Sequence, residues 1–89
     1  MSSTRLVFSS DGVRPLASLA CGEGGTIVDV WRSDLHRRDR LLALGVTPGA
    51  RVTMLQTFPG IVFLCDQTEL AIERAVAEAI LVRPGEGHR

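Results

Sequence analysis

The stretch RLLALGVTPGA, residues 40–50, decides the fold of this chain. Leu41 and Leu44 lie three positions apart, which favours a helix with both side chains on one face. Gly45 follows at once and can take the positive φ that ends a helix at least steric cost. Pro48-Gly49 suits a type II turn, because Pro fixes φ at the second position and Gly supplies positive φ at the third. The stretch therefore predicts a helix end, a tight turn and the entry to a strand.

Composition bounds the class of protein. The chain has 89 residues, 45% of them hydrophobic, which is enough for one compact domain and against intrinsic disorder. Its formal net charge is zero and aromatic residues make up 4%, so binding of nucleic acid by charge or by base stacking is not expected. All ten cationic residues are arginines, and they are scattered. A general coding bias explains that choice better than bidentate anion recognition does.

No segment suggests a membrane or a secreted protein. No apolar run approaches the roughly 20 residues that a membrane helix needs. The apolar part of residues 1–8 is three residues long, which is too short for a signal peptide. Two cysteines do not imply a disulfide framework. A cytosolic protein is the expectation.

The rest of the chain consists of short strand and turn patterns. The glycine-rich loop 21–25 leads into a strand and lacks a following Gly-Lys-Ser/Thr, so a turn is expected there rather than a phosphate cradle. Ser33 or Asp34 can cap a helix over 35–44. Strands are predicted at 26–31, at 51–57 with Val52 and Met54 inward, at 61–65 covered on both faces, at 69–73 with Leu70 and Ile72 inward, and at 80–82. Short helical turns are expected within 15–20 and 74–79.

These elements predict a mainly β fold, a small partly closed barrel of about five strands with short helical insertions. The domain is expected over 15–83, after an N-terminal extension (1–14, whose residues 6–8 can add a strand) and before a flexible tail (84–89). An open two-layer α+β sandwich is the alternative. It is less favoured because no long amphipathic helix is available to cover a sheet.

The order of these pieces resembles the FeoA family, the small ferrous iron transport protein A with an SH3-like barrel. The most specific piece is the Arg-Leu-x-x-Leu-Gly-x-x-Pro-Gly string at 40–49. The other pieces are 16–22 leading to 25–28, Pro59-Gly60 before a hairpin, and 70–72 followed by a short helix and 80–82. The chain departs from the family in the apolar Val62 and Leu64 and in Cys21.

The resemblance implies a non-enzymatic accessory of bacterial ferrous iron uptake that binds the GTPase domain of the FeoB membrane transporter. Contact through apolar surface is expected at Leu41, Leu44, Phe58 and Pro59, although burial is the alternative for both leucines. The same barrel also forms the last domain of some iron-dependent regulators. Because no helix-turn-helix precedes the barrel here, the stand-alone interpretation is favoured. No catalytic constellation is present in the sequence, so an enzyme is not expected.

Metal binding is a second hypothesis, of a Zn(II) or Fe(II) sensor or delivery protein. The candidate ligands are Cys21, His36, Glu23 and Glu69. Cys65 ends an apolar strand and is expected in the core. One chain is expected to provide two or three ligands, with either Glu23 or Glu69 as the additional oxygen, whereas zinc prefers about four. A tight site would therefore be shared between two chains in a metal-bridged homodimer. No cofactor is expected to be required, and an unliganded surface thiol and imidazole remain the simpler interpretation.

Overall fold

The computed structural model describes residues 12–30 and 35–85, with the side chains of 35–37 excepted. Its elements, in chain order, are β1 (Arg14–Pro15), the 3-10 helix η3 (Leu16–Ser18), β2 (Gly24–Val30), α1 (Leu35–Ala43), β3 (Arg51–Gln56), β4 (Ile61–Cys65), β5 (Thr68–Ile72), α2 (Arg74–Ala77) and β6 (Ile80–Pro84). The predicted mainly β fold is confirmed. The cap positions Ser33 and Asp34 and the possible strand at 6–8 lie outside the described residues.

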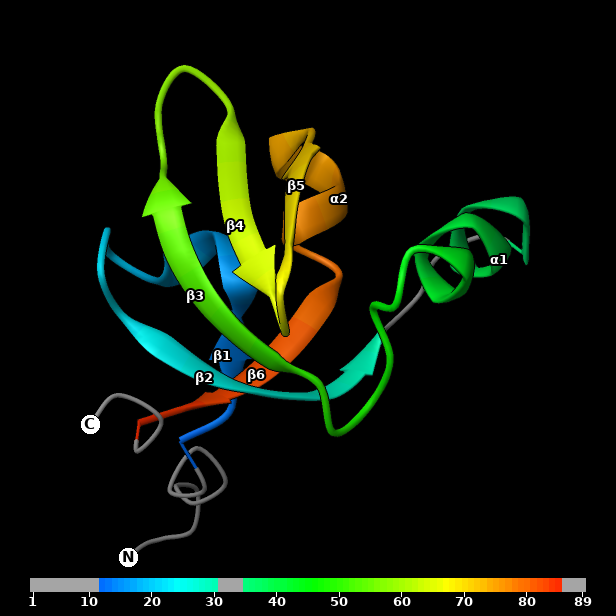
Figure 1. The fold of residues 1–89 in the computed structure, drawn as a ribbon, viewed down its shortest axis with the longest axis horizontal. Coiled ribbons are helices and arrows are strands. Elements are labelled where there is room, and N and C mark those ends of the chain that lie inside the picture. Colours follow the sequence, from blue (N-terminus) through cyan, green and yellow to red (C-terminus); the bar gives the residue numbers. More distant parts are fainter. Residues whose placement is uncertain (1–11, 31–34, 86–89) are drawn as a thin grey trace, which may run out of the picture.

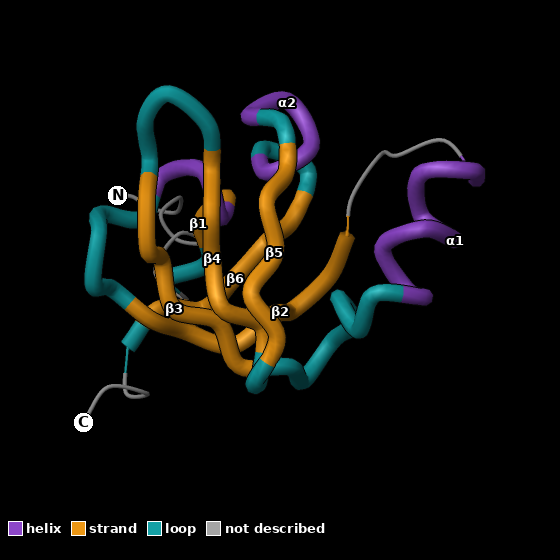
Figure 2. Tube along the Cα trace, turned by 45° about the horizontal axis from the view of Figure 1, so that its top comes forward, coloured by secondary structure: helices purple, strands orange, loops and turns teal. Residues whose placement is uncertain are grey.

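The strands form one antiparallel sheet in the order β1-β6-β2-β3-β4-β5. The sheet curls strongly, as Figures 1 and 2 show. The helix η3 follows β1 at one edge, α2 follows β5 at the other, and these two short helices contact each other. The contact brings the two edges of the sheet together, as a partly closed barrel requires.

The sequence predicts about five strands, and residues 12–30 and 35–85 form six. The additional strand, β1, pairs Arg14 with Val82 and Pro15 with Leu81 of β6. A two-residue strand has no periodicity of its own, so only its pairing partner defines it. The sheet therefore includes Arg14 and Pro84, one residue beyond each end of the predicted domain.

The core lies inside the curled sheet, and the buried residues that the structure describes are all apolar. Val52 and Met54 point inward as predicted, and Leu70 is buried while Ile72 is only partly so. The largest fully buried side chains are Phe63, Leu16, Leu19, Ile27, Met54, Ile61, Ile80, Val46 and Val82. The prediction that 61–65 is covered on both faces is wrong, because Val62 and Leu64 are only half-buried on the outer face of β4.

The segment 40–50 forms the helix end and turn that its sequence predicts. Gly45 has φ +94°, its N–H donates to the carbonyl of Leu42 (3.0 Å), and the Val46 N–H donates to that of Leu41 (2.9 Å). These two bonds make a Schellman motif, and the buried side chains of Leu41 and Val46 supply its usual apolar contact. Gly49 has φ +97° and the Ala50 N–H donates to the Thr47 carbonyl at 3.0 Å, as a type II turn requires.

The turn also fastens this segment to β2. The Gly49 N–H donates to the carbonyl of Ile27, and the Ile27 N–H donates to the carbonyl of Ala50, both at 2.8 Å. Beyond this anchor α1 projects away from the sheet (Figure 1). In the part of the chain that the structure describes, no helix is long and apolar enough to cross a membrane.

Candidate interaction surface

The most exposed large apolar side chain in the described residues belongs to the turn between β3 and β4. We call residues 57–60 the tip loop. Phe58 is 81% exposed, and the bond from Phe58 to Pro59 is cis. The strands beneath the loop are paired as far as Gln56 and Val62, with a register shift between Met54 and Gln56. The loop therefore extends from the end of a paired hairpin, at the top of Figure 1, and presents an aromatic ring to solvent.

Two side chains hold the tip loop. The Gln56 Nε2 donates across the loop to the carbonyl of Gly60 at 3.4 Å. The Arg74 guanidinium, from the first residue of α2, donates to the carbonyl of Thr57. The second bond ties the loop to an element 17 residues further along the chain.

A second exposed apolar area lies at the end of α1. Leu41 is 4% exposed, whereas Leu42 is 46% and Leu44 is 49% exposed. The sequence predicted that Leu41 and Leu44 share a helix face, but α1 ends at Ala43, so Leu44 already belongs to the cap. Burial of Leu41 removes its side chain from any contact surface of this structure. Leu44 remains available for contact.

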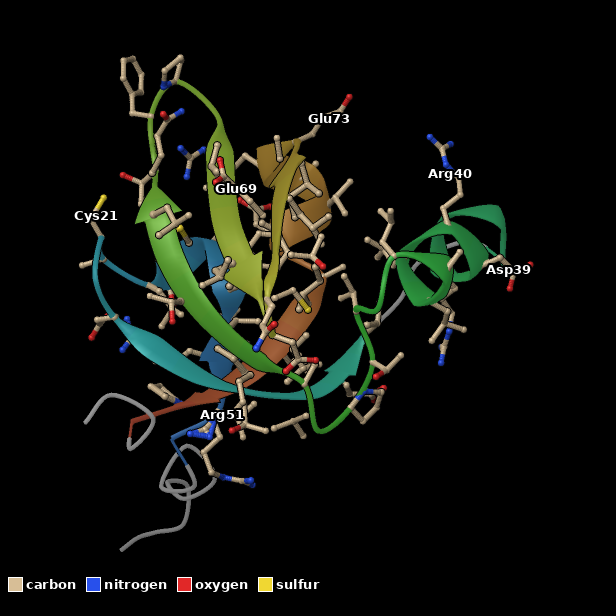
Figure 3. All side chains as sticks on the ribbon, in the orientation of Figure 1. Cys21, Asp39, Arg40, Arg51, Glu69 and Glu73 are labelled. Carbon is tan, nitrogen blue, oxygen red and sulfur yellow. The ribbon has the colours of Figure 1, made fainter. Side chains whose placement is uncertain are left out.

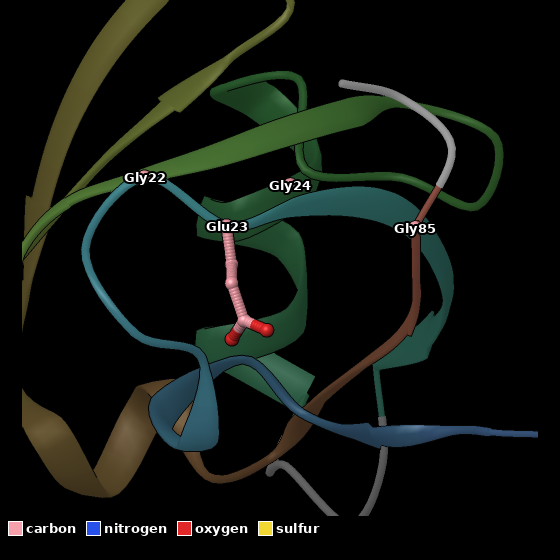
Figure 4. Close-up of a pocket in the computed structure, with 4 residues that line it drawn as sticks. All are labelled: Gly22, Glu23, Gly24 and Gly85. Atoms are coloured by element: carbon pink, nitrogen blue, oxygen red, sulfur yellow. The ribbon is translucent and has the colours of Figure 1, made fainter. Parts of the chain in front are cut away.

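The glycine-rich turn before β2 carries Cys21 and Glu23. Cys21 is exposed, and its thiol donates to the carbonyl of Leu55 at 3.6 Å. The Glu23 carboxylate accepts the Ala20 N–H at 2.7 Å and lies 3.9 Å from the Arg14 guanidinium. These contacts give Glu23 a structural role within its own turn. Figure 4 shows the notch of about 240 Å³ that Glu23 lines with Gly22, Gly24 and Gly85.

The side chains that the structure describes do not bring the predicted metal ligands together in a metal-binding group within one chain. Figure 3 places Cys21 and Glu69 on different elements, and Glu69 is exposed on β5. His36 lies in α1, but its side chain is outside the described part. Among the residues that are described, no three His, Cys, Asp or Glu side chains gather in a group that could hold a metal ion.

Cys65 is a core residue, as predicted. Its side chain is 3% exposed and its thiol donates to the carbonyl of Gly45 at 3.5 Å. Burial raises the pKa of the Cys65 thiol above its ordinary value, and the neighbouring Asp66 carboxylate raises it further. A thiol with a raised pKa stays protonated, so Cys65 is a poor metal ligand and a poor nucleophile.

Comparison with known proteins decides the family. The model of the FeoA domain matches residues 14–84, which run from the first residue of β1 to the last of β6. The chain belongs to the FeoA family. The resemblance that rests on the 40–49 string is thereby confirmed. The FeoA family is associated with ferrous iron transport and consists of small accessory domains.

Two solved FeoA structures are similar over most of this FeoA chain. A crystal structure of an iron uptake regulatory protein (FeoA) is 28% identical, with a TM-score of 0.74, and the match covers 82% of this chain and 99% of that one. The FeoA protein of Chlorobium tepidum is 31% identical, with a TM-score of 0.71, covering 83% of this chain and 75% of that one. Among curated proteins, no match is found.

Two more distant structures share the fold alone. A manganese-dependent transcriptional repressor is 22% identical, with a TM-score of 0.74 over 80% of this chain, and the match spans only 41% of the repressor. Stenotrophomonas maltophilia FeoA, in complex with zinc, is 18% identical with a TM-score of 0.72, covering 82% of this chain and 96% of that one. The SH3-like fold is therefore shown, and regulator proteins use it as well.

Sequence reasoning found Phe58 and Pro59 but missed other members of the exposed surface. Leu42, which is 46% exposed, belongs to an apolar run, and such a run does not reveal which face is covered. Leu55, which is 43% exposed, lies on the outward side of the alternation that places Val52 and Met54 inward. The sequence indicates Arg74 only as the first residue of a short helical turn. Its contact with Thr57 is tertiary, and no local pattern signals it.

Proposed function

We propose that this FeoA protein is a non-enzymatic cytosolic accessory of ferrous iron uptake that binds the GTPase domain of a FeoB-type transporter and modulates it. The observation that carries the proposal is the 81% exposure of Phe58 in a family associated with ferrous iron transport. A large aromatic side chain left in water at a hairpin end is the kind of residue that anchors a protein interface. Pro59 beside it is exposed as well, and Leu55 on β3 is a further exposed apolar residue.

Charge gives little support for an alternative mode of binding. The chain has ten basic and ten acidic residues and no net charge. Contact through apolar surface depends weakly on salt, whereas contact through exposed charges is screened over a distance of about 10 Å at 0.1 M salt. The tip loop is therefore the first surface to test, and the end of α1 with Leu44 is the second.

The test is to replace Phe58 by serine and measure the dissociation constant for a purified FeoB GTPase domain. Loss of an anchor residue costs about 2 kcal/mol or more, so binding should weaken about 30-fold. Ala71→Ser, an exposed substitution on β5, is the matched control and should leave binding unchanged. Both variants should unfold at the midpoint of the parent protein.

Binding that is unchanged by Phe58→Ser but is lost in moderate salt would assign recognition to the arginines instead. Binding that is lost in Leu44→Ser alone would move the contact to the end of α1. Either result would overturn the assignment of the tip loop while keeping FeoB as the partner.

A metal-binding sensor or delivery role is the second candidate, favoured by the zinc complex of Stenotrophomonas maltophilia FeoA. The described residues of a single chain do not fit a zinc site, because Cys21 stands apart from Glu69 and Glu23 is engaged by Ala20 and Arg14. A site shared between chains is the arrangement that we consider, because the described side chains of one chain do not form such a group. In that arrangement the exposed thiol of Cys21 would be one of the ligands.

A further inference from the structure

Among the described turn and loop bonds, the tip loop has no hydrogen bond between two backbone groups. The ladder of β3 and β4 ends at the pair of Gln56 and Val62. A four-residue connection without internal bonds samples several conformations unless side chains restrain it.

The two hydrogen bonds that restrain the tip loop differ in strength. The bond from Gln56 to Gly60 is 3.4 Å long, beyond the usual range for N–H···O, and neither partner is charged. The bond from Arg74 to the Thr57 carbonyl carries the positive charge of a guanidinium, and charge-assisted hydrogen bonds are the stronger class. Arg74 therefore supplies most of the restraint on the residue that precedes Phe58.

We propose that Arg74 is a positioning residue for partner binding, which holds the tip loop from α2 so that Phe58 is presented in one orientation. The inference rests on the proposed function, because the partner is the one named there. Arg74 itself is not assigned a contact with the partner. A loop that is ordered before binding loses less conformational entropy when it binds, so its affinity is higher for the same contacts.

The loop order is tested first, without any partner. Backbone amide order parameters of Phe58 and Gly60 are measured by NMR in the parent chain, in Arg74→Gln and in Arg83→Gln. Arg83 is exposed on β6, so its substitution removes the same charge away from the loop. In Arg74→Gln the order parameters should fall from near 0.85 toward 0.6 or below, and in Arg83→Gln they should not change. Order parameters that stay at the parent value in Arg74→Gln would overturn the proposal.

Binding is then tested with a double-mutant cycle against the FeoB GTPase domain. Arg74→Gln should weaken binding about three- to tenfold in the parent background, as expected when one rotamer-rich segment must be ordered on binding. In the Phe58→Ser background the same substitution should have almost no effect, because the ring that Arg74 positions is already gone. An equal loss in both backgrounds would show that Arg74 contacts the partner directly, and would overturn the positioning role.

The two proposals fail in distinguishable ways. If the parent chain does not bind FeoB, the proposed function is overturned, whereas the order parameters still decide whether Arg74 orders the tip loop. If the parent binds and Arg74→Gln binds equally well with a disordered loop, the positioning role is overturned and the proposed function stands. The unfolding midpoint of Arg74→Gln should equal that of Arg83→Gln, since neither arginine belongs to the core.

Discussion

Replacing Gly25 by alanine is expected to destabilise the domain, because the new methyl group would meet the backbone of β6. Gly25 lies in β2 opposite Pro84 in the antiparallel ladder. A Cβ atom built at Gly25 would lie 2.6 Å from the Arg83 carbonyl oxygen and 2.9 Å from the Pro84 Cα. Both neighbours are backbone atoms, so neither can rotate away as a side chain would.

The size of the effect follows from this distance. Ordinary van der Waals contact begins at 3.4 Å, so β6 would have to retreat from β2 by about 0.8 Å. Such a shift would strain the ladder that continues through the pair of Ile27 and Val82, both fully buried. Overpacking of this kind lowers the free energy of unfolding by about 1–3 kcal/mol. Because the contact is with backbone atoms, Gly25→Ala is expected in the upper half of that range. For a domain of this size about 2–3 kcal/mol lowers the melting temperature by roughly 10–20 °C.

The assay is urea unfolding followed by far-UV circular dichroism, with Gly60→Ala as the matched control. A Cβ atom at Gly60 would meet no atom within 4 Å, and Gly60 does not have a positive φ. The control should therefore stay within about 0.5 kcal/mol of the parent. If Gly25→Ala unfolded at the same midpoint as Gly60→Ala, the close approach of β2 and β6 would be refuted.

Two further predictions concern the helix end and the metal hypothesis. Gly45→Ala should lower the free energy of unfolding in urea by about 1 kcal/mol. The cause is backbone strain alone, because φ is +94° and the space around the new Cβ is open. An unchanged midpoint would show that the helix does not end there. If zinc binds, sedimentation velocity should show a dimer fraction that rises with zinc, disappears in Cys21→Ser and falls at lower pH as protons compete for the ligands. A monomer under every condition would contradict the shared zinc site.

Much of the fold could be predicted because local chemistry specifies it. The positive φ of Gly45 and Gly49 follows from glycine's freedom at positions where a helix and a turn must end. The inward positions Val52 and Met54 follow from the period of two in a strand. Strand β1 could not be predicted, because two residues carry no period and Pro15 also suits the start of a helix.

The candidate site was less predictable than the fold, because its contacts depend on tertiary packing and not on local sequence. Phe58 could be suggested because it stands beside Pro59-Gly60, where a strand must break. The bond from Arg74 to Thr57 depends on how α2 folds back toward the β3–β4 turn, and no sequence period encodes that approach. The three leucines of 41–44 could not be sorted into buried and exposed, because the sorting depends on the residue at which the helix ends.

Helix α1 contributes little to the core, although the segment 40–50 that contains its end decides the fold. Among the helical residues whose side chains are described, 38–43, only Leu41 is buried. Burial of one leucine contributes about 1.5–3 kcal/mol, which is a fraction of the stability of a small domain. Local opening of α1 should therefore require less free energy than unfolding of the sheet. The Schellman motif and the bonds from Ile27 to the turn hold the helix end in place, and the exposed Leu42 and Leu44 can change without loss of the core.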